Sequence, residues 1–112
     1  MENATTLLET SKVPGTPVFN TIAEPIGEVD ELEIDTTTGK VRYAVMSFGG
    51  VLGIGKSHYP IPWLAMKWDA ALQGYVTGVT VEQLENAPAG SSWSDRDWET
   101  KIHTNYGAPA YW

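Results

Sequence analysis

The chain has no cysteine and few positive charges, and both absences exclude classes of function. Without a thiol, the 112-residue protein can form neither a disulfide framework nor a thiolate metal or redox centre. Seven Lys and Arg against fourteen Asp and Glu leave a net charge of −7. Nucleic-acid binders and proteins that dock on anionic membranes both need an excess of basic side chains. We therefore expect no direct contact with nucleic acid or with an anionic membrane surface.

Long hydrophobic runs and targeting signals are also lacking. No apolar run approaches the ~20 residues that a membrane-spanning helix needs. Residues 1–10 carry no basic segment of the kind that opens a secretory signal. These features lead us to expect a cytoplasmic protein without a membrane span. A chain of 112 residues has room for one domain with one hydrophobic core.

The pattern of the sequence changes near residue 88. Upstream, short apolar segments alternate with glycine turns, whereas downstream the sequence is polar and rich in tryptophan. We expect a flexible N-terminal lead-in over residues 1–8, one domain over residues 9–87 and a helical appendage over residues 88–112.

Strand-like segments dominate the expected domain. Residues 41–48 are apolar on both faces, which predicts a central strand covered on both sides. Pro17 confines its own short segment to a sheet edge or to the start of a strand. The other segments that have the pattern of a strand are residues 16–20, 26–35, 56–62, 63–68 and 74–78. Five or six short strands predict a mostly β fold, a small barrel or roll.

The segment that ends at residue 35 does not keep strict alternation. Val29, Leu32 and Ile34 are all expected to face the core, yet a strand of period two cannot place all three on one side. An extra residue near Asp30 or Glu31, forming a β-bulge, would restore the phase.

Two helices are expected. Thr80 followed by Gln83 has the spacing of a capping box, so a short helix begins there and ends before Pro88. The second helix begins after an N-cap within residues 94–97 and ends near Gly107, a residue type favoured just beyond a helix C-terminus.

Residues 50–57 match the phosphate-binding pattern G-x-x-x-x-G-K-[ST]. Such a site needs a helix that begins at the Lys-Ser pair, because the helix N-terminus holds the anion. Here the pair is followed by two prolines within residues 58–62, which prevents a helix. We interpret the segment as a glycine-rich hairpin loop and not as a nucleotide site.

Acidic residues crowd the segment from residue 28 to residue 35. The spacing lacks the bend glycine and the terminal Glu of a calcium loop. Pairing across a hairpin with Lys40 and Arg42 explains the acids as one solvated face. We therefore expect no metal site there.

His58 and His103 are the only histidines. No Ser nucleophile stands in a recognisable setting beside either of them, so neither indicates a hydrolase. Glu99 and His103, four residues apart on the expected helix, could form half of a metal site, but such pairs are more often surface contacts. We expect no catalytic residue, no metal and no cofactor.

Half of the ten Trp and Tyr residues lie within the last twenty residues. Trp98, Ile102 and Tyr106 follow helical spacing and form one apolar stripe. The stripe and the Tyr-Trp end must pack either on the chain's own barrel or on a partner, and the sequence leaves both alternatives open. The candidate interaction surface consists of Val51, Leu52, Ile54, Trp93, Trp98, Ile102, Tyr106, Tyr111 and Trp112.

Three stretches together resemble a PRC-barrel domain: residues 25–35, residues 38–50 and the Pro-Ile-Pro-Trp of residues 60–63. The resemblance covers roughly residues 9–87, and the GK-VRYAV-SFGG-LGIG stretch is its most specific part. The W-DRDW and YG-P-YW patterns of the tail are similar to the appendage of small stand-alone members.

The resemblance implies a six-stranded β-barrel, the fold of the cytoplasmic part of the photosynthetic reaction-centre H subunit and of the C-terminal domain of a bacterial ribosome-maturation factor. It further implies a non-catalytic scaffold for protein–protein contacts and transfers no active-site residue. We expect an adaptor module that forms a homodimer and binds an unidentified protein partner. The alternative is an accessory factor in RNA processing or ribosome maturation that acts through a protein partner.

Overall fold

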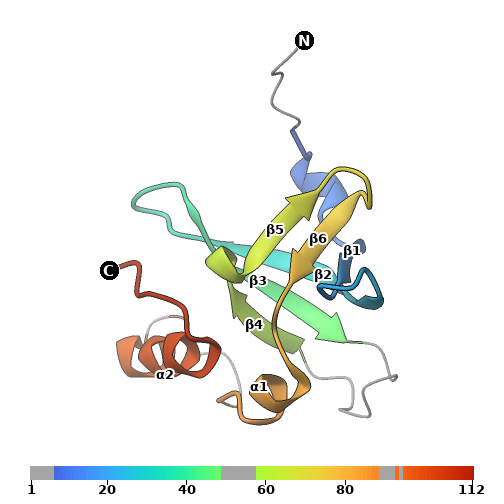
Figure 1. Cartoon of the computed structure of the whole chain (residues 1–112). Helices are drawn as coiled ribbons and strands as arrows, with labels where there is room; N and C mark the ends of the chain where they lie inside the picture. Colours follow the sequence, from blue (N-terminus) through green and yellow to red (C-terminus); the bar gives the residue numbers. More distant parts are fainter. Residues whose placement is uncertain (1–6, 49–57, 89–92, 94) are drawn as a thin grey trace.

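The computed structural model describes residues 7–48, 58–88, 93 and 95–112 (Figure 1). Six strands form one sheet in the order β4-β3-β2-β1-β6-β5. The strands are β1 (Thr16–Phe19), β2 (Pro25–Ile34), β3 (Val41–Phe48), β4 (His58–Pro62), β5 (Met66–Asp69) and β6 (Gly74–Thr77). The helices are the 3₁₀ turns η1 (Thr10–Lys12) and η3 (Trp63–Ala65) and the α-helices α1 (Val81–Glu85) and α2 (Arg96–Tyr106).

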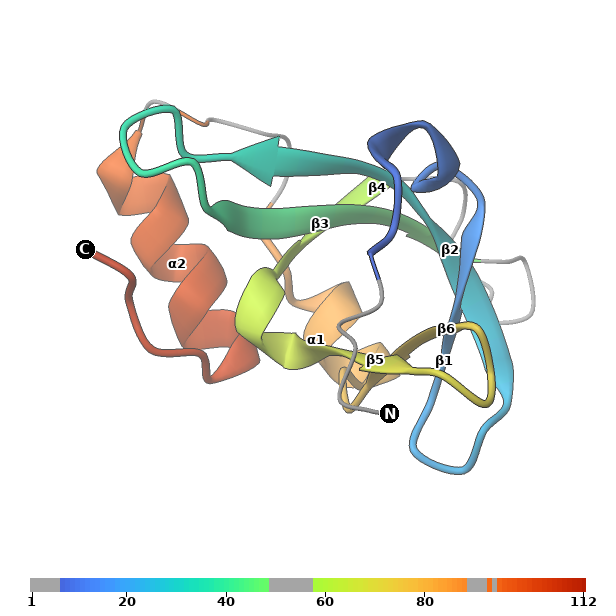
Figure 2. The same cartoon turned by 90° about the horizontal axis from the view of Figure 1, so that it is seen from above.

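The sheet curls strongly, so that it encloses an interior as an incomplete barrel (Figure 2). Both α-helices lie on the side of β4 (Figure 1). The mostly β fold with six strands and a C-terminal helix confirms the predicted fold class. Among the described residues, no helix has the length and apolar character needed to cross a membrane.

Strand β1 is internal and not at a sheet edge. It pairs antiparallel with β2 and parallel with β6. Pro17 is the second residue of the strand, and the pairing with β6 starts one residue later, at Val18 and Tyr75. The missing N–H of the proline therefore falls where that ladder has not begun. Of the two alternatives predicted for Pro17, a sheet edge or the start of a strand, the structure shows the start of a strand.

The register of β2 against β3 shifts at Asp30, so the predicted bulge is present. Val29 is fully buried, and Leu32 packs partly buried against the core. A second shift lies just before Ile34, and the Ile34 side chain is 52% exposed. The extra residue at this second irregularity is Arg42 of β3, and Ile34 is the last residue of β2. The expectation that Ile34 faces the core is wrong, because the regular pairing of the two strands ends there.

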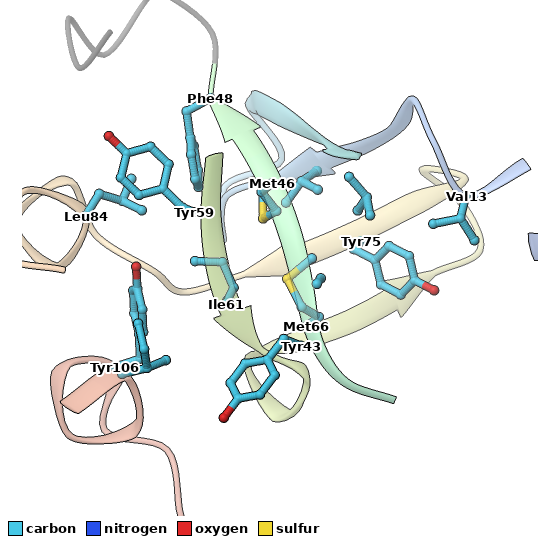
Figure 3. Close-up of a cluster of buried hydrophobic side chains, with 14 of the residues drawn as sticks. Val13, Tyr43, Met46, Phe48, Tyr59, Ile61, Met66, Tyr75, Leu84 and Tyr106 are labelled. Carbon is cyan, nitrogen blue, oxygen red and sulfur yellow. The ribbon is translucent and has the colours of Figure 1, made fainter. Parts of the chain in front are cut away.

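Strand β3 is buried on both faces, as its sequence predicts. Only Val41, Arg42 and Ser47 of its eight residues are less than fully buried. Figure 3 shows Met46 of β3 beside Met66 of β5, with Ile61 of β4 close by. The two apolar faces of β3 therefore contribute to one continuous core.

The segment over residues 63–68 is only partly a strand. Residues 63–65 form η3, and β5 begins at Met66. The expected strand is thus shorter, because the chain must turn from β4 at one end of the sheet to β5 at the other.

Both α-helices begin and end as predicted. Thr80 Oγ1 accepts from the Gln83 N–H at 3.1 Å, and Gln83 Oε1 accepts from the Thr80 N–H at 2.9 Å, which is a complete capping box. Asp95 caps α2 by accepting from the Asp97 N–H. Gly107 ends α2 with φ of 66°, a left-handed conformation that suits glycine.

Candidate protein-interaction surface

The apolar stripe of α2 packs on its own chain. Trp98, Ile102 and Tyr106 are all buried, and α2 lies against β4. Figure 3 shows Tyr106 on the side of the barrel where Tyr59 and Leu84 lie. Of the two alternatives left open by the sequence, the structure shows packing within the chain.

The other residues of the candidate surface have different environments. Trp93 and Trp112 are exposed, and Tyr111 is partly buried. Val51, Leu52 and Ile54, together with the whole phosphate-binding pattern, lie outside the described residues. The exposed aromatic part of the candidate surface therefore consists of Trp93, which precedes α2, and Trp112 of the C-terminal tail, residues 107–112.

An apolar groove of about 410 Å³ lies where the tail meets the barrel. Pro109 and Tyr111 of the tail line the groove together with Leu64 of η3, which is 66% exposed. The lining residues are Lys40, Val41, Arg42, Pro62, Trp63, Leu64, His103, Pro109 and Tyr111. The sequence alone did not suggest Leu64 or the groove, because β3, η3 and the tail are brought together only by the fold.

A second, more polar cleft of about 390 Å³ lies between the β2–β3 hairpin and the N-terminal half of α2. Tyr111 lines both clefts, so the tail separates them. Charged side chains of both signs line the polar cleft, namely Glu33, Asp35, Arg42, Arg96 and Glu99.

Both arginines of the chain hold the aromatic rings of the tail. The Arg42 guanidinium lies 4.2 Å from the centre of the Tyr111 ring, and that of Arg96 lies 4.2 Å from the Trp112 ring. Such cation–π contacts are each worth about 0.5–1 kcal/mol at exposed sites. Arg42 also forms the predicted pair with Asp35 at 3.1 Å. The Thr37 N–H and the Arg42 guanidinium lower the pKa of Asp35 from its ordinary value.

Glu99 and His103 are both buried and both contact Tyr43, so the expected surface contact between them is wrong. Their exposed fractions are 4% and 6%. Glu99 Oε1 accepts from the Tyr43 hydroxyl at 2.7 Å and from the Tyr111 hydroxyl at 2.5 Å. His103 Nε2 lies 2.9 Å from the same Tyr43 hydroxyl, and Nδ1 lies 2.9 Å from the Pro109 carbonyl oxygen. We call these five residues the tail network.

Tyr43 is the member of the tail network with a polar side chain that the sequence did not indicate. It lies on β3, 56 positions before Glu99, and only its place in a strand with two buried faces indicated a buried phenol. Burial and the nearby Glu99 carboxylate raise the pKa of Tyr43 well above its ordinary value of 10. The same causes raise the pKa of Tyr111 to about 12. Both phenols therefore keep their protons at neutral pH.

The described residues contain no cluster of three or more His, Asp or Glu side chains that could hold a metal ion. The buried Glu99 and His103 are instead occupied by Tyr43 and by the tail.

Comparison with known proteins gives one family match. Residues 6–83 match the sequence model of the PRC-barrel domain, which covers all six strands and most of α1. The helix α2 and the tail lie beyond the matched residues. No curated protein sequence matches the chain.

Proposed function

Because the chain belongs to the PRC-barrel domain family, we propose that it is a non-catalytic module for protein–protein contacts that docks through the apolar groove. One observation carries the proposal. The groove combines a volume of about 410 Å³ with an exposed aliphatic rim at Leu64. Exposed apolar surface that borders such a groove is typical of interaction sites.

The side chains around the groove are suited to a large apolar contact. Trp112, 46% exposed, packs beside His103 with ring centres 4.9 Å apart. Trp63 packs edge to face on Tyr75, which fixes the ring on the barrel side. Rigid aromatic side chains lose little conformational entropy on binding and are common at the centres of interfaces.

The partner that we propose is a second copy of the chain. Two chains that each carry a charge of −7 repel one another unless they associate through a surface that carries basic as well as acidic side chains. The groove and the adjoining polar cleft bring Lys40, Arg42 and Arg96 to the acids of the β2–β3 hairpin. A two-fold dimer, the commonest oligomer, therefore meets least repulsion on this face.

Sedimentation velocity at tens of micromolar tests the dimer. Leu64→Asp places a charge on the rim without touching the core, and we expect it to weaken self-association at least tenfold. Ile22→Asp is the matched control, since Ile22 is 72% exposed in the β1–β2 turn, away from α2 and the tail. A wild-type protein that stays monomeric, or equal effects of the two variants, would count against the proposal.

A further inference from the structure

The Tyr43 hydroxyl lies between two groups that both ordinarily accept hydrogen bonds. It is 2.7 Å from Glu99 Oε1 and 2.9 Å from His103 Nε2. All three side chains are buried, so water does not readily replace either contact. A phenol has a single proton and can donate only one hydrogen bond.

The other nitrogen of His103 settles which tautomer the ring adopts. Nδ1 lies 2.9 Å from the Pro109 carbonyl oxygen, and a carbonyl can only accept. Nδ1 therefore carries a proton. A neutral imidazole has one N–H only, so Nε2 of a neutral His103 would be an acceptor that faces Tyr43.

When Glu99 is ionised and His103 is neutral, the tail network has one proton fewer than its hydrogen bonds require. With ionised Glu99 and neutral His103, Tyr43 donates to one of them, and the other contact brings two lone pairs together. One added proton allows both contacts of Tyr43 to be hydrogen bonds, in either of two arrangements. In the first, His103 Nε2 carries the proton and donates to the Tyr43 oxygen, while the Tyr43 hydroxyl donates to Glu99. In the second, Glu99 carries the proton and donates to the Tyr43 oxygen, while the Tyr43 hydroxyl donates to His103.

Charged groups face the network from α2 and from the barrel, including Lys40 and Arg42, which line the apolar groove together with His103. The Nε of Arg96, on α2, lies 3.5 Å from Glu99 Oε2. From the barrel side, Arg42 of β3 is paired with Asp35 of the hairpin. The remaining acid of the adjoining cleft is Glu33 of β2, whose pKa is raised to about 7 mainly by desolvation. The geometry places the extra proton between His103 and Glu99, which both contact the Tyr43 hydroxyl.

We propose that the tail network is a proton-dependent latch: the tail docks on α2 and β3 with the uptake of one proton, held between His103 and Glu99 through Tyr43. When the proton leaves, one of the two Tyr43 contacts breaks and the hold on Pro109 and Tyr111 weakens. These residues line the apolar groove. The latch therefore regulates the groove, a consequence that rests on the proposed function, whereas the latch itself does not.

The direction of the pH effect follows from linkage. A docked state that binds one more proton than the released state is favoured as pH falls. The ratio of docked to released tail therefore falls as pH rises, by at most about tenfold per pH unit, the limit for one proton.

Nuclear magnetic resonance of the full chain labelled with ¹⁵N and ¹³C tests the latch. The readouts are the His103 ring nitrogens, the Glu99 carboxyl carbon and the contacts between Trp112 and His103, followed from pH 6 to pH 9. We expect the extra proton on Nε2 or on the carboxylate, and loss of the Trp112 contacts as pH rises. A His103 without a proton on Nε2, an ionised Glu99 and docking that does not change with pH would overturn the proposal.

Two variants separate the latch from a merely structural contact. Glu99→Gln presents an amide that can donate to the Tyr43 oxygen without an added proton, so docking should persist and lose its pH dependence. Tyr43→Phe removes the bridge, and we expect weaker docking with no pH dependence. Tyr75→Phe, on β6, is the control that should keep the wild-type profile. A Glu99→Gln variant that retains the wild-type pH profile would contradict the proposal.

The two proposals can fail separately. The resonance measurements are made in the Leu64→Asp background, in which the groove is not expected to self-associate. If the wild type proves monomeric, the latch stays testable on the same signals. If the latch fails, the sedimentation result for Leu64→Asp is unaffected.

Discussion

Strand β3 buries both of its faces and helix α2 buries one face, and different interactions hold the two elements. Hydrogen-bonded ladders to β2 and β4 hold β3, and its buried side chains are almost all apolar. The helix α2 buries Glu99 and His103 beside its apolar stripe. Its buried stripe also carries the Trp98 Nε1 and Tyr106 hydroxyl groups, which have no hydrogen-bond partner in the described part of the chain.

The different interactions that hold β3 and α2 indicate which of the two can separate from the rest of the fold. Apolar burial is non-directional and depends mainly on area. A buried polar network, in contrast, stabilises only while every member has its partner, and each buried polar group without one costs about 1–3 kcal/mol. We therefore expect the barrel to be the more stable part, and the layer formed by α2 and the tail to be the part that solution conditions can loosen.

The largest expected effect is that of removing a core side chain from the barrel. Met46 lies within β3, and its side chain is fully buried. Met46→Ala should lower the free energy of unfolding by about 2–5 kcal/mol, because it removes buried apolar atoms and leaves a cavity. Urea denaturation followed by circular dichroism measures the change.

Ile102→Ala makes the matched change in α2, where Ile102 is also fully buried. We expect it to release α2 more than it destabilises the sheet, so that amide exchange speeds up in α2 and stays slow in β3. Uniform loss of protection in both elements would show that the two regions unfold as one unit, which would contradict a difference in stability between them.

Gly27→Ala tests how closely β2 and β3 approach. A Cβ atom on Gly27 would lie 2.3 Å from the Ser47 carbonyl oxygen, which is backbone and cannot move aside without disturbing the ladder. We expect a loss of about 1–3 kcal/mol of stability, typical of overpacking. Gly78→Ala is the control, because its Cβ would meet nothing within 4 Å. Thermal denaturation should separate the two variants, and equal midpoints would refute the close approach.

Tyr43→Phe measures the connection between the two regions. The variant removes a hydroxyl that contacts both Glu99 and His103, and we expect a loss of about 1–2 kcal/mol. Tyr75→Phe removes a phenol on β6, outside the tail network, and should cost less. If chemical denaturation gives the same change in the free energy of unfolding for both variants, the hydroxyl of Tyr43 does not stabilise the packing of α2 on β3.

The smallest expected effect concerns Glu33 and pH. Desolvation, followed by the neighbouring Glu31, raises the pKa of Glu33 from 4.5 to about 7. The folded state thus holds a proton that the unfolded state has released, and this contribution to stability is full below pH 4.5 and is lost as pH rises through about 7. Glu33 is partly solvent-exposed, so Glu33→Gln should stabilise the protein by only about 0.5–1 kcal/mol at pH 8. At pH 4 the two proteins should unfold alike; a difference that stays constant with pH would rule out this assignment.

Much of the barrel could be predicted because its signals are local. The bulge at Asp30 follows from the spacing of apolar residues in β2, and the capping box follows from Thr80 and Gln83. The exposure of Ile34 could not be predicted, since the second irregularity lies at Arg42 of the neighbouring strand β3 and leaves no mark in the spacing of apolar residues in β2. The parallel pairing of β1 with β6 joins segments almost sixty residues apart, which no local pattern reports.

The candidate surface was predictable only in its residue types. Aromatic side chains concentrated in the tail indicated an element that must pack, and the stripe of α2 indicated which face would do so. The groove at Leu64 and the role of Tyr43 depend on contacts between β3, η3, α2 and the tail. Such contacts are set by the path of the chain and not by spacing within one element.

The sequence by itself determined that this protein has no thiol chemistry, carries an acidic surface and folds into short strands followed by an aromatic helical tail. Those properties depend on composition and on periodicity, which act locally along the chain. Only the tertiary structure decided that α2 packs on its own barrel and that Glu99 and His103 are buried. The physical reason is that a buried carboxylate and imidazole need partners, and Tyr43 reaches them only when β3 and α2 lie side by side.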